Sequence, residues 1–167
     1  MMEAEFELFA GDLERASREL AEGRIVLEES TDTGYLATVM GFQGHICAEL
    51  GRDEEALRHA AEAEATSQAD DFEPHARARI VRALILSRRG ELEAAERALA
   101  EAAELVEPRD FVIMHLDLAF ARAEVARRTG RTDVERQALE QAVAVAEAKG
   151  HVLGADRARA GLAALGG

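Results

Sequence analysis

Apolar residues recur at helical spacing along nearly the whole chain, and the periodic segments are separated by glycines. Before Gly51, for example, Leu36, Val39, Met40 and Ile46 follow the spacing of one helix face. Glycine suits such a break because it readily adopts the left-handed conformation that ends a helix. No segment shows the alternating pattern of a strand. The pattern therefore predicts an all-α chain with helices at 3–10, 12–29, 34–50, 52–68, 73–89, 91–106, 110–129, 132–149 and 151–165.

Four glycines open similar phrases at nearly equal intervals. Gly11, Gly51, Gly90 and Gly130 begin GDLERA, GRDEEA, GELEAA and GRTDVE, and they are spaced by 40, 39 and 40 residues. A fixed period of this size indicates an array of helical repeats. We therefore expect a single repeat domain over residues 1–167, folded as a right-handed α-solenoid of antiparallel helix pairs. The expected pairs occupy 3–29, 34–68, 73–106 and 110–149, and a helix at 151–165 caps the exposed end.

The connections between the pairs carry a second set of signals. Thr33, Asp71 and Asp110 stand where helices are expected to begin, and each can accept a hydrogen bond as an N-cap. Pro74 falls in the first turn of its helix, where its missing N–H costs nothing. These residues predict where the first helix of each pair starts.

The first predicted helix is much shorter than its counterparts. It leaves the apolar residues Phe6, Leu8 and Phe9 with little of the chain to cover them. A missing upstream repeat, or self-association through this incomplete helix, would supply the cover.

The glycine phrases resemble the tetratricopeptide repeat. That family places a small residue before the turn glycine and small or large apolar residues at set distances after it, a pattern that Gly44, Gly51, Ala56, Ala60 and Ala63 follow. Small residues allow two helix axes to approach closely. The other units match at Gly11, Ala16, Leu20 and Gly23, at Ala83, Gly90, Ala95, Leu99 and Ala102, and at Ala123, Gly130, Leu139 and Ala142.

The fourth unit departs from the family pattern at one position. Glu135 occupies the slot that holds alanine five residues after the other turn glycines. A shift of one residue would place Val134 there instead. The sequence leaves both registers open.

The period near 40 and the richness in Ala, Leu, Glu and Arg resemble one subgroup of these arrays. It is the C-terminal repeat region of bacterial regulators that combine an ATPase module with a nucleotide-cyclase or LuxR-type DNA-binding domain. The resemblance implies a groove lined by the first helix of each pair. The lining residues expected here to bind a partner are Thr38, His45, Glu49, Arg77, Ile80, Leu84, Arg88, Asp117, Phe120, Glu124 and Arg127.

Charge and composition narrow the classes of partner. The formal net charge of −13 opposes binding to nucleic acids and to anionic membranes. The single cysteine excludes an internal disulfide, and no apolar run is long enough to cross a membrane. These features predict a soluble, cytoplasmic chain.

Candidate chemistry is sparse. Glu55 with His59 and His45 with Glu49 could share helix faces, but they form no established metal motif, and surface ion pairs explain them. Cys47 is expected to be a buried apolar residue rather than a nucleophile. No phosphate-binding glycine loop is present, and close helix packing accounts for the glycine clusters at 41–44 and 150–154. We therefore expect no metal, cofactor or catalytic residue.

Arginines concentrate on one predicted helix of this acidic chain. They are either paired with glutamates of adjacent helices or form a basic strip that grips an acidic peptide. The sequence leaves both readings open. The arginines are Arg77, Arg79, Arg82, Arg88 and Arg89.

Taken together, these features predict a non-catalytic scaffold for protein–protein interaction, the repeat arm of a bacterial signalling or transcriptional regulator. Its partner segment would lie along the concave face. A small-molecule sensor is the alternative, and a metal-dependent enzyme is a more distant one.

Overall fold

The computed structural model describes residues 7–9, 11–29 and 33–166, and its regular structure over these residues is entirely helical. From residue 12 onward, every predicted helix is present with ends within two residues of those expected. The predicted helix at 3–10 lies mostly outside the described residues, although residues 7–9 are helical. The helices are α2 (Leu13–Glu28), α3 (Thr33–Glu49), α4 (Asp53–Thr66), α5 (Phe72–Arg88), α6 (Leu92–Val106), α7 (Val112–Arg128), α8 (Thr132–Ala148) and α9 (Val152–Ala164).

The turn glycines close the helices as the sequence predicts. Gly51, Gly90 and Gly130 have φ angles of +74°, +79° and +70°, and Gly11 has +87°. The residue after each glycine donates its backbone N–H to the carbonyl five residues earlier, as in Arg52 to Cys47 at 2.8 Å. This bond satisfies a carbonyl that the last helical turn leaves without a partner. Gly150 makes the same kind of turn at φ +69°, and a Cβ there would meet nothing within 4 Å, so the expectation that close helix packing accounts for this glycine was wrong.

Two of the three residues expected to be N-caps do not occupy that position. Asp110 is not the N-cap of α7, because that helix starts at Val112 after Phe111. The Asp110 carboxylate instead accepts a hydrogen bond from Lys149 Nζ at 2.7 Å. Thr33 is the first residue of α3 rather than the residue before it. Asp71 directly precedes α5, and Pro74 lies in its first turn, as expected.

Two caps were not anticipated. Asp12 Oδ1 accepts the N–H of Arg15 at 3.2 Å and so begins α2. His151 Nδ1 accepts the N–H of Gly154 at 3.0 Å and begins α9. Both side chains satisfy donors that the first helical turn leaves free.

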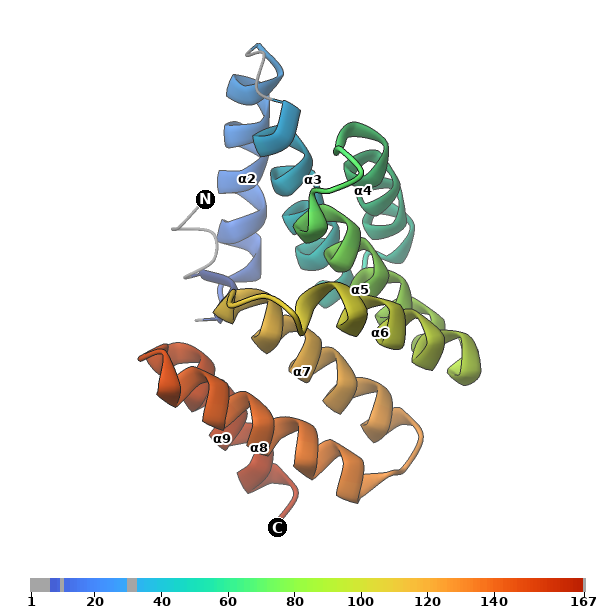
Figure 1. Ribbon diagram of the computed structural model, residues 1–167, viewed down its shortest axis with the longest axis vertical. Coiled ribbons are helices and arrows are strands. Elements are labelled where there is room, and N and C mark those ends of the chain that lie inside the picture. Colours follow the sequence, from blue (N-terminus) through green and yellow to red (C-terminus); the bar gives the residue numbers. More distant parts are fainter. Residues whose placement is uncertain (1–6, 10, 30–32, 167) are drawn as a thin grey trace. The chain divides into compact units, whose positions relative to one another are not determined.

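The chain divides into two compact units, residues 1–82 and 83–167, with the boundary inside α5. In the first unit α3 packs against both α2 and α4 (Figure 1). Gly44 explains the close approach of α3 and α4: a Cβ there would lie 3.2 Å from the Ala56 carbonyl oxygen and 3.3 Å from the Ala60 nitrogen. Phe42 and Ile46 are fully buried in the core of this unit.

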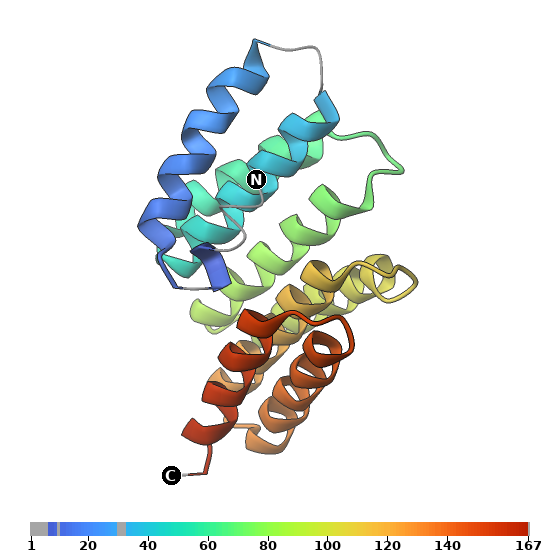
Figure 2. The ribbon, with the colours of Figure 1, turned by 90° about the vertical axis from the view of Figure 1, so that its left-hand side faces the viewer.

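In the second unit α7 and α8 form an antiparallel pair, and α9 packs against α8 (Figure 2). A Cβ on Gly161 of α9 would lie 3.0 Å from Leu139 Cδ1. Leu162 and Leu165 pack against the apolar cluster that contains Leu139 and Ala138. The last helix therefore covers apolar surface of α8, which is the packing expected of a capping helix.

The structure decides the register of α8 between the two alternatives left by the sequence. Glu135 is buried, with 8% of its surface exposed, whereas Val134 is 40% exposed. Ala16, Ala56 and Ala95 occupy the corresponding position, five residues after the turn glycine, in the other helix pairs, and all three are fully buried. The fourth helix pair therefore keeps the register of the other pairs and accommodates a glutamate in an alanine position.

The apolar residues at the N-terminus have more cover than expected. Leu8 and Phe9 are 1% and 6% exposed. The expectation that these two residues need cover from outside the chain was therefore wrong. Phe6 lies outside the described residues.

No helix within the described residues combines the length and the apolar character that a membrane span requires.

Candidate functional site

The residues predicted to line a concave face divide by burial into two groups. Five are buried and contribute to packing in this structure: His45, Arg77, Ile80, Leu84 and Asp117. Thr38, Glu49, Arg88, Phe120 and Glu124 are partly exposed, and Arg127 is exposed. The set therefore mixes surface positions with core positions.

Arg77 illustrates why a charged residue of this set is buried. Its guanidinium lies over the Phe42 ring, 3.7 Å from the ring centroid, and Nη2 donates to Glu73 Oε1 at 3.1 Å. A Cβ on Gly41 would lie 3.4 Å from Arg77 Cδ, so glycine leaves space for the arginine stem. The ion pair and the aromatic face offset the cost of removing the charge from water. Arg77 acts here as a core residue of the first unit.

The neighbouring arginines of α5 are tied to an adjacent helix. Arg79 Nη1 and Arg82 Nη1 both donate to Glu64 Oε1 of α4, at 3.2 and 3.0 Å. Arg82 also pairs with the second oxygen of the same carboxylate. For these two residues, the structure shows the pairing with an adjacent helix that was one of the two readings of the arginine cluster, whereas Arg77 pairs with Glu73 of its own helix.

The predicted residues Phe120, Glu124 and Arg127 of α7 contact other residues of the second unit. Glu124 pairs with Arg127 at 2.6 Å and with Arg128 at 2.7 Å. Burial tends to raise the pKa of Glu124, but the hydrogen bonds from the two arginines outweigh it, and its pKa is lowered. Phe120 packs against the apolar cluster of Ala123, Ala138 and Leu139 and carries the Arg157 guanidinium 4.4 Å from its ring centroid.

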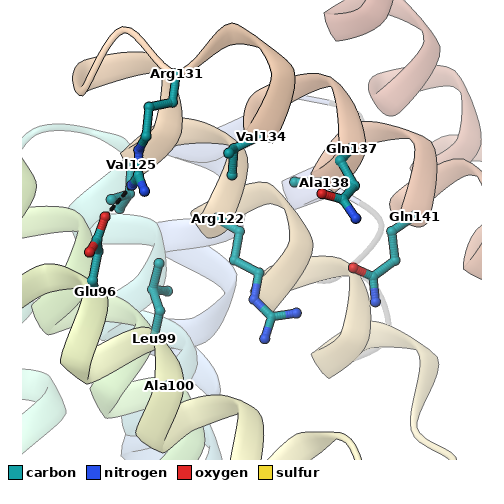
Figure 3. Close-up of a pocket in the computed structure, with 10 residues that line it drawn as sticks. All are labelled: Glu96, Leu99, Ala100, Arg122, Val125, Arg131, Val134, Gln137, Ala138 and Gln141. Carbon is teal, nitrogen blue, oxygen red and sulfur yellow. Dashed lines mark hydrogen bonds and ion pairs between the residues drawn. The ribbon is translucent and has the colours of Figure 1, made fainter.

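A groove in the second unit offers a more continuous surface. It has a volume of about 370 Å³ and lies where α6, α7 and α8 meet (Figure 3). None of its lining residues belongs to the predicted set. The lining residues are Glu96, Leu99, Ala100, Arg122, Val125, Arg131, Val134, Gln137, Ala138 and Gln141.

The lining of this groove, which we call the α6–α8 groove, combines buried apolar residues with exposed polar ones. Leu99, Val125 and Ala138 are 6%, 1% and 5% exposed and form its apolar part. Gln137 and Gln141 stand one turn apart on α8 and are both exposed. An apolar base with a few polar groups is the usual composition of a recognition site.

Arginines provide the positive charge of the groove. Arg131 pairs with Glu96 at one end of it, and Arg122, Gln137 and Gln141 lie away from that end (Figure 3). Arg122 Nη2 donates to Glu107 Oε1 at 3.0 Å, where the glutamate side chain is 56% exposed. Exposed pairs of this kind are weak, so a ligand carboxylate can compete for the arginine.

The sequence analysis missed this groove because it searched the first helix of each pair. The groove lies instead against the second helices, α6 and α8, with α7 between them. One signal was present in the sequence. Gln137 and Gln141 are two uncharged amides spaced by four residues in a helix whose other polar residues are mostly charged.

The groove can bind but offers little for bond chemistry. Amide side chains both donate and accept hydrogen bonds, and arginine recognises carboxylates. Among the ten lining residues, Glu96 is the only acid, and it is paired with Arg131. The arrangement therefore offers hydrogen-bonding groups and positive charge beside an apolar surface.

Comparisons of the chain with models of known protein families, with curated proteins and with solved structures find no match.

Proposed function

We propose that the chain is a non-catalytic interaction module that binds an extended, acidic segment of a partner protein in the α6–α8 groove. The observation that carries the proposal is the lining of that groove. Its apolar part can accept the side chains of a peptide, and Gln137 and Gln141 can hydrogen-bond to the peptide backbone. Arg122 can take an acidic side chain in exchange for its exposed pair with Glu107.

The wider proposal is a tetratricopeptide-like array that forms a right-handed solenoid, and that serves as the repeat arm of a bacterial signalling or transcriptional regulator. It is supported by the recurrence of one local design. Gly51, Gly90 and Gly130 each close a helix with positive φ, and a buried residue follows each of them five positions later. Such arrays bind partner segments along extended surfaces.

The experiment is a selection from a display library of random-sequence peptides against the full chain, followed by affinity measurements on the enriched peptides. We expect the enriched peptides to contain Asp or Glu. Arg122→Glu and Gln141→Leu should each weaken binding by roughly tenfold or more, because each removes a polar anchor.

Arg97→Glu is the matched control, because Arg97 is an exposed arginine of α6 outside the lining of this groove. It should leave affinity within about twofold of the unmodified chain, since exposed charges away from a contact contribute little. Peptides that bind all three variants equally well would contradict the proposal, as would a failure to enrich any peptide.

A further inference from the structure

Three potential metal ligands converge in the first unit. Cys47 lies on α3, and Glu55 and His59 lie one turn apart on α4. One ligand atom from each residue, the thiol sulfur, a carboxylate oxygen and an imidazole nitrogen, lies within 4.8 Å of the others. The close approach of α3 and α4 at Gly44 brings the thiol within reach of the pair on α4.

We propose that Cys47, Glu55 and His59 bind a divalent transition-metal cation of the zinc type. Thiolate, imidazole and carboxylate are the side-chain ligands that zinc accepts, and three of them leave a fourth position for water. Ligand atoms around tetrahedral zinc lie roughly 3.3–3.8 Å apart, as bond lengths of about 2.0–2.3 Å require. The observed spacing therefore needs only a small side-chain adjustment to close on the ion.

The imidazole of His59 is oriented for this role. Its Nε2 lies 3.9 Å from Glu55 Oε1, on the side of the proposed ion. Its Nδ1 lies 3.5 Å from Glu62 Oε2, which favours a proton on that nitrogen. Arg24 Nη1 lies 3.3 Å from the same nitrogen and opposes this tautomer, because a guanidinium can only donate. Burial and the neighbouring Arg58 lower the pKa of His59, and the neutral ring is the form that binds metal.

Besides Arg24, two features oppose binding and shape the test. Arg58 Nη2 lies 3.4 Å from His59 Nε2 and 3.7 Å from a Glu55 oxygen, so its positive charge sits beside the proposed ion position. The Arg58 side chain is 55% exposed and can move into solvent. Burial, with a smaller contribution from Glu55, raises the pKa of Cys47 to about 11. Binding must therefore displace the thiol proton, which passes to solvent as the sulfur–metal bond forms.

The test is a titration of the metal-free chain with Co²⁺, followed by absorption spectroscopy. Cys47 is the only cysteine of the sequence, so a thiolate-to-cobalt charge-transfer band reports on this site alone. We expect the band in the unmodified chain, and we expect Zn²⁺ to abolish it by competition. Arg58→Ala should tighten Co²⁺ binding, because it removes the competing charge.

The variants separate a built site from a thiol that binds metal by itself. Cys47→Ser should lose the band, and His59→Gln and Glu55→Gln should each weaken Co²⁺ binding roughly tenfold or more. Glu54→Gln, an exposed neighbour on α4, should behave as the unmodified chain. Glu55 is also exposed, so its variant should fold even if the buried substitutions do not. Absence of the band, or equal binding by Glu55→Gln and Glu54→Gln, would overturn the proposal.

Discussion

Single glycines decide how closely helices of this chain pack, and two of them should respond oppositely to the same change. A Cβ on Gly44 would press on backbone atoms of α4 at 3.2 and 3.3 Å, whereas a Cβ on Gly23 of α2 meets nothing within 4 Å. Backbone atoms cannot yield as a flexible side chain does, so α3 and α4 would have to move apart.

We therefore expect Gly44→Ala to lower the free energy of unfolding by about 1–3 kcal/mol, the usual cost of overpacking. Gly23→Ala should raise it by about 0.5–1 kcal/mol, because alanine favours the helix and glycine does not. Urea denaturation of both variants measures the difference. If Gly44→Ala were as stabilising as Gly23→Ala, the close contact of α3 with α4 would not exist.

His59 makes the stability of the chain sensitive to mild acid. Burial and the adjacent Arg58 lower its pKa in the folded state, so between the folded value and about 6.5 the unfolded chain binds more protons. The contribution of the neutral ring is present above pH 6.5 and is lost as the pH falls through the folded pKa. We expect His59→Gln to lose less stability between pH 7 and pH 5 than the unmodified chain. Urea denaturation at several pH values measures this loss. An equal loss of stability in the variant and in the unmodified chain would contradict the prediction.

At the scale of elements, α8 accommodates a glutamate where the corresponding helices of the other pairs carry alanine. Glu135 is buried at that slot, and burial of a carboxylate is costly unless its partners compensate. We expect Glu135→Ala to raise the free energy of unfolding by roughly 1 kcal/mol. Glu140→Ala, at an exposed site of the same helix, controls for helix propensity. A greater gain from Glu140→Ala, measured by urea denaturation, would show that Glu135 is well paired.

The elements were largely predictable because their ends have local causes. The positive φ of Gly51, Gly90 and Gly130 follows from the absence of a Cβ, and the sequence shows it directly. The start of α7 was misjudged because Asp110 pairs with Lys149, which is distant in sequence. A cap competes with such tertiary contacts, and spacing along the chain does not reveal which one forms.

The site was far less predictable than the elements. The resemblance pointed to first-helix positions, but burial of Arg77 and Asp117 depends on how several helices pack together. The α6–α8 groove arises in the same way, because α6, α7 and α8 each contribute only part of its lining. Periodicity gives the apolar side of a helix, but it does not show where two packed helices leave a gap.

At the scale of the whole molecule, the net negative charge should decide how stability responds to salt. The formal net charge is −13, so acidic side chains outnumber the arginines and lysines that pair with them. Self-repulsion at low ionic strength should therefore outweigh the loss of surface ion pairs when salt is added. We expect the melting temperature to rise between about 10 mM and 150 mM NaCl, where the screening length falls from about 30 Å to 8 Å. A fall in melting temperature over that range would mean that ion pairs such as Arg131–Glu96 matter more than net charge.

The central claim is that the partner segment binds in the α6–α8 groove. The most direct measurement is a map of amide chemical-shift changes in the isotope-labelled chain, titrated with a peptide enriched by the selection. We predict that the largest changes occur at the exposed groove residues of α7 and α8, including Arg122, Gln137 and Gln141. Changes centred instead on the first-helix positions Thr38, Glu49 and Arg88, with none at the groove, would contradict the account.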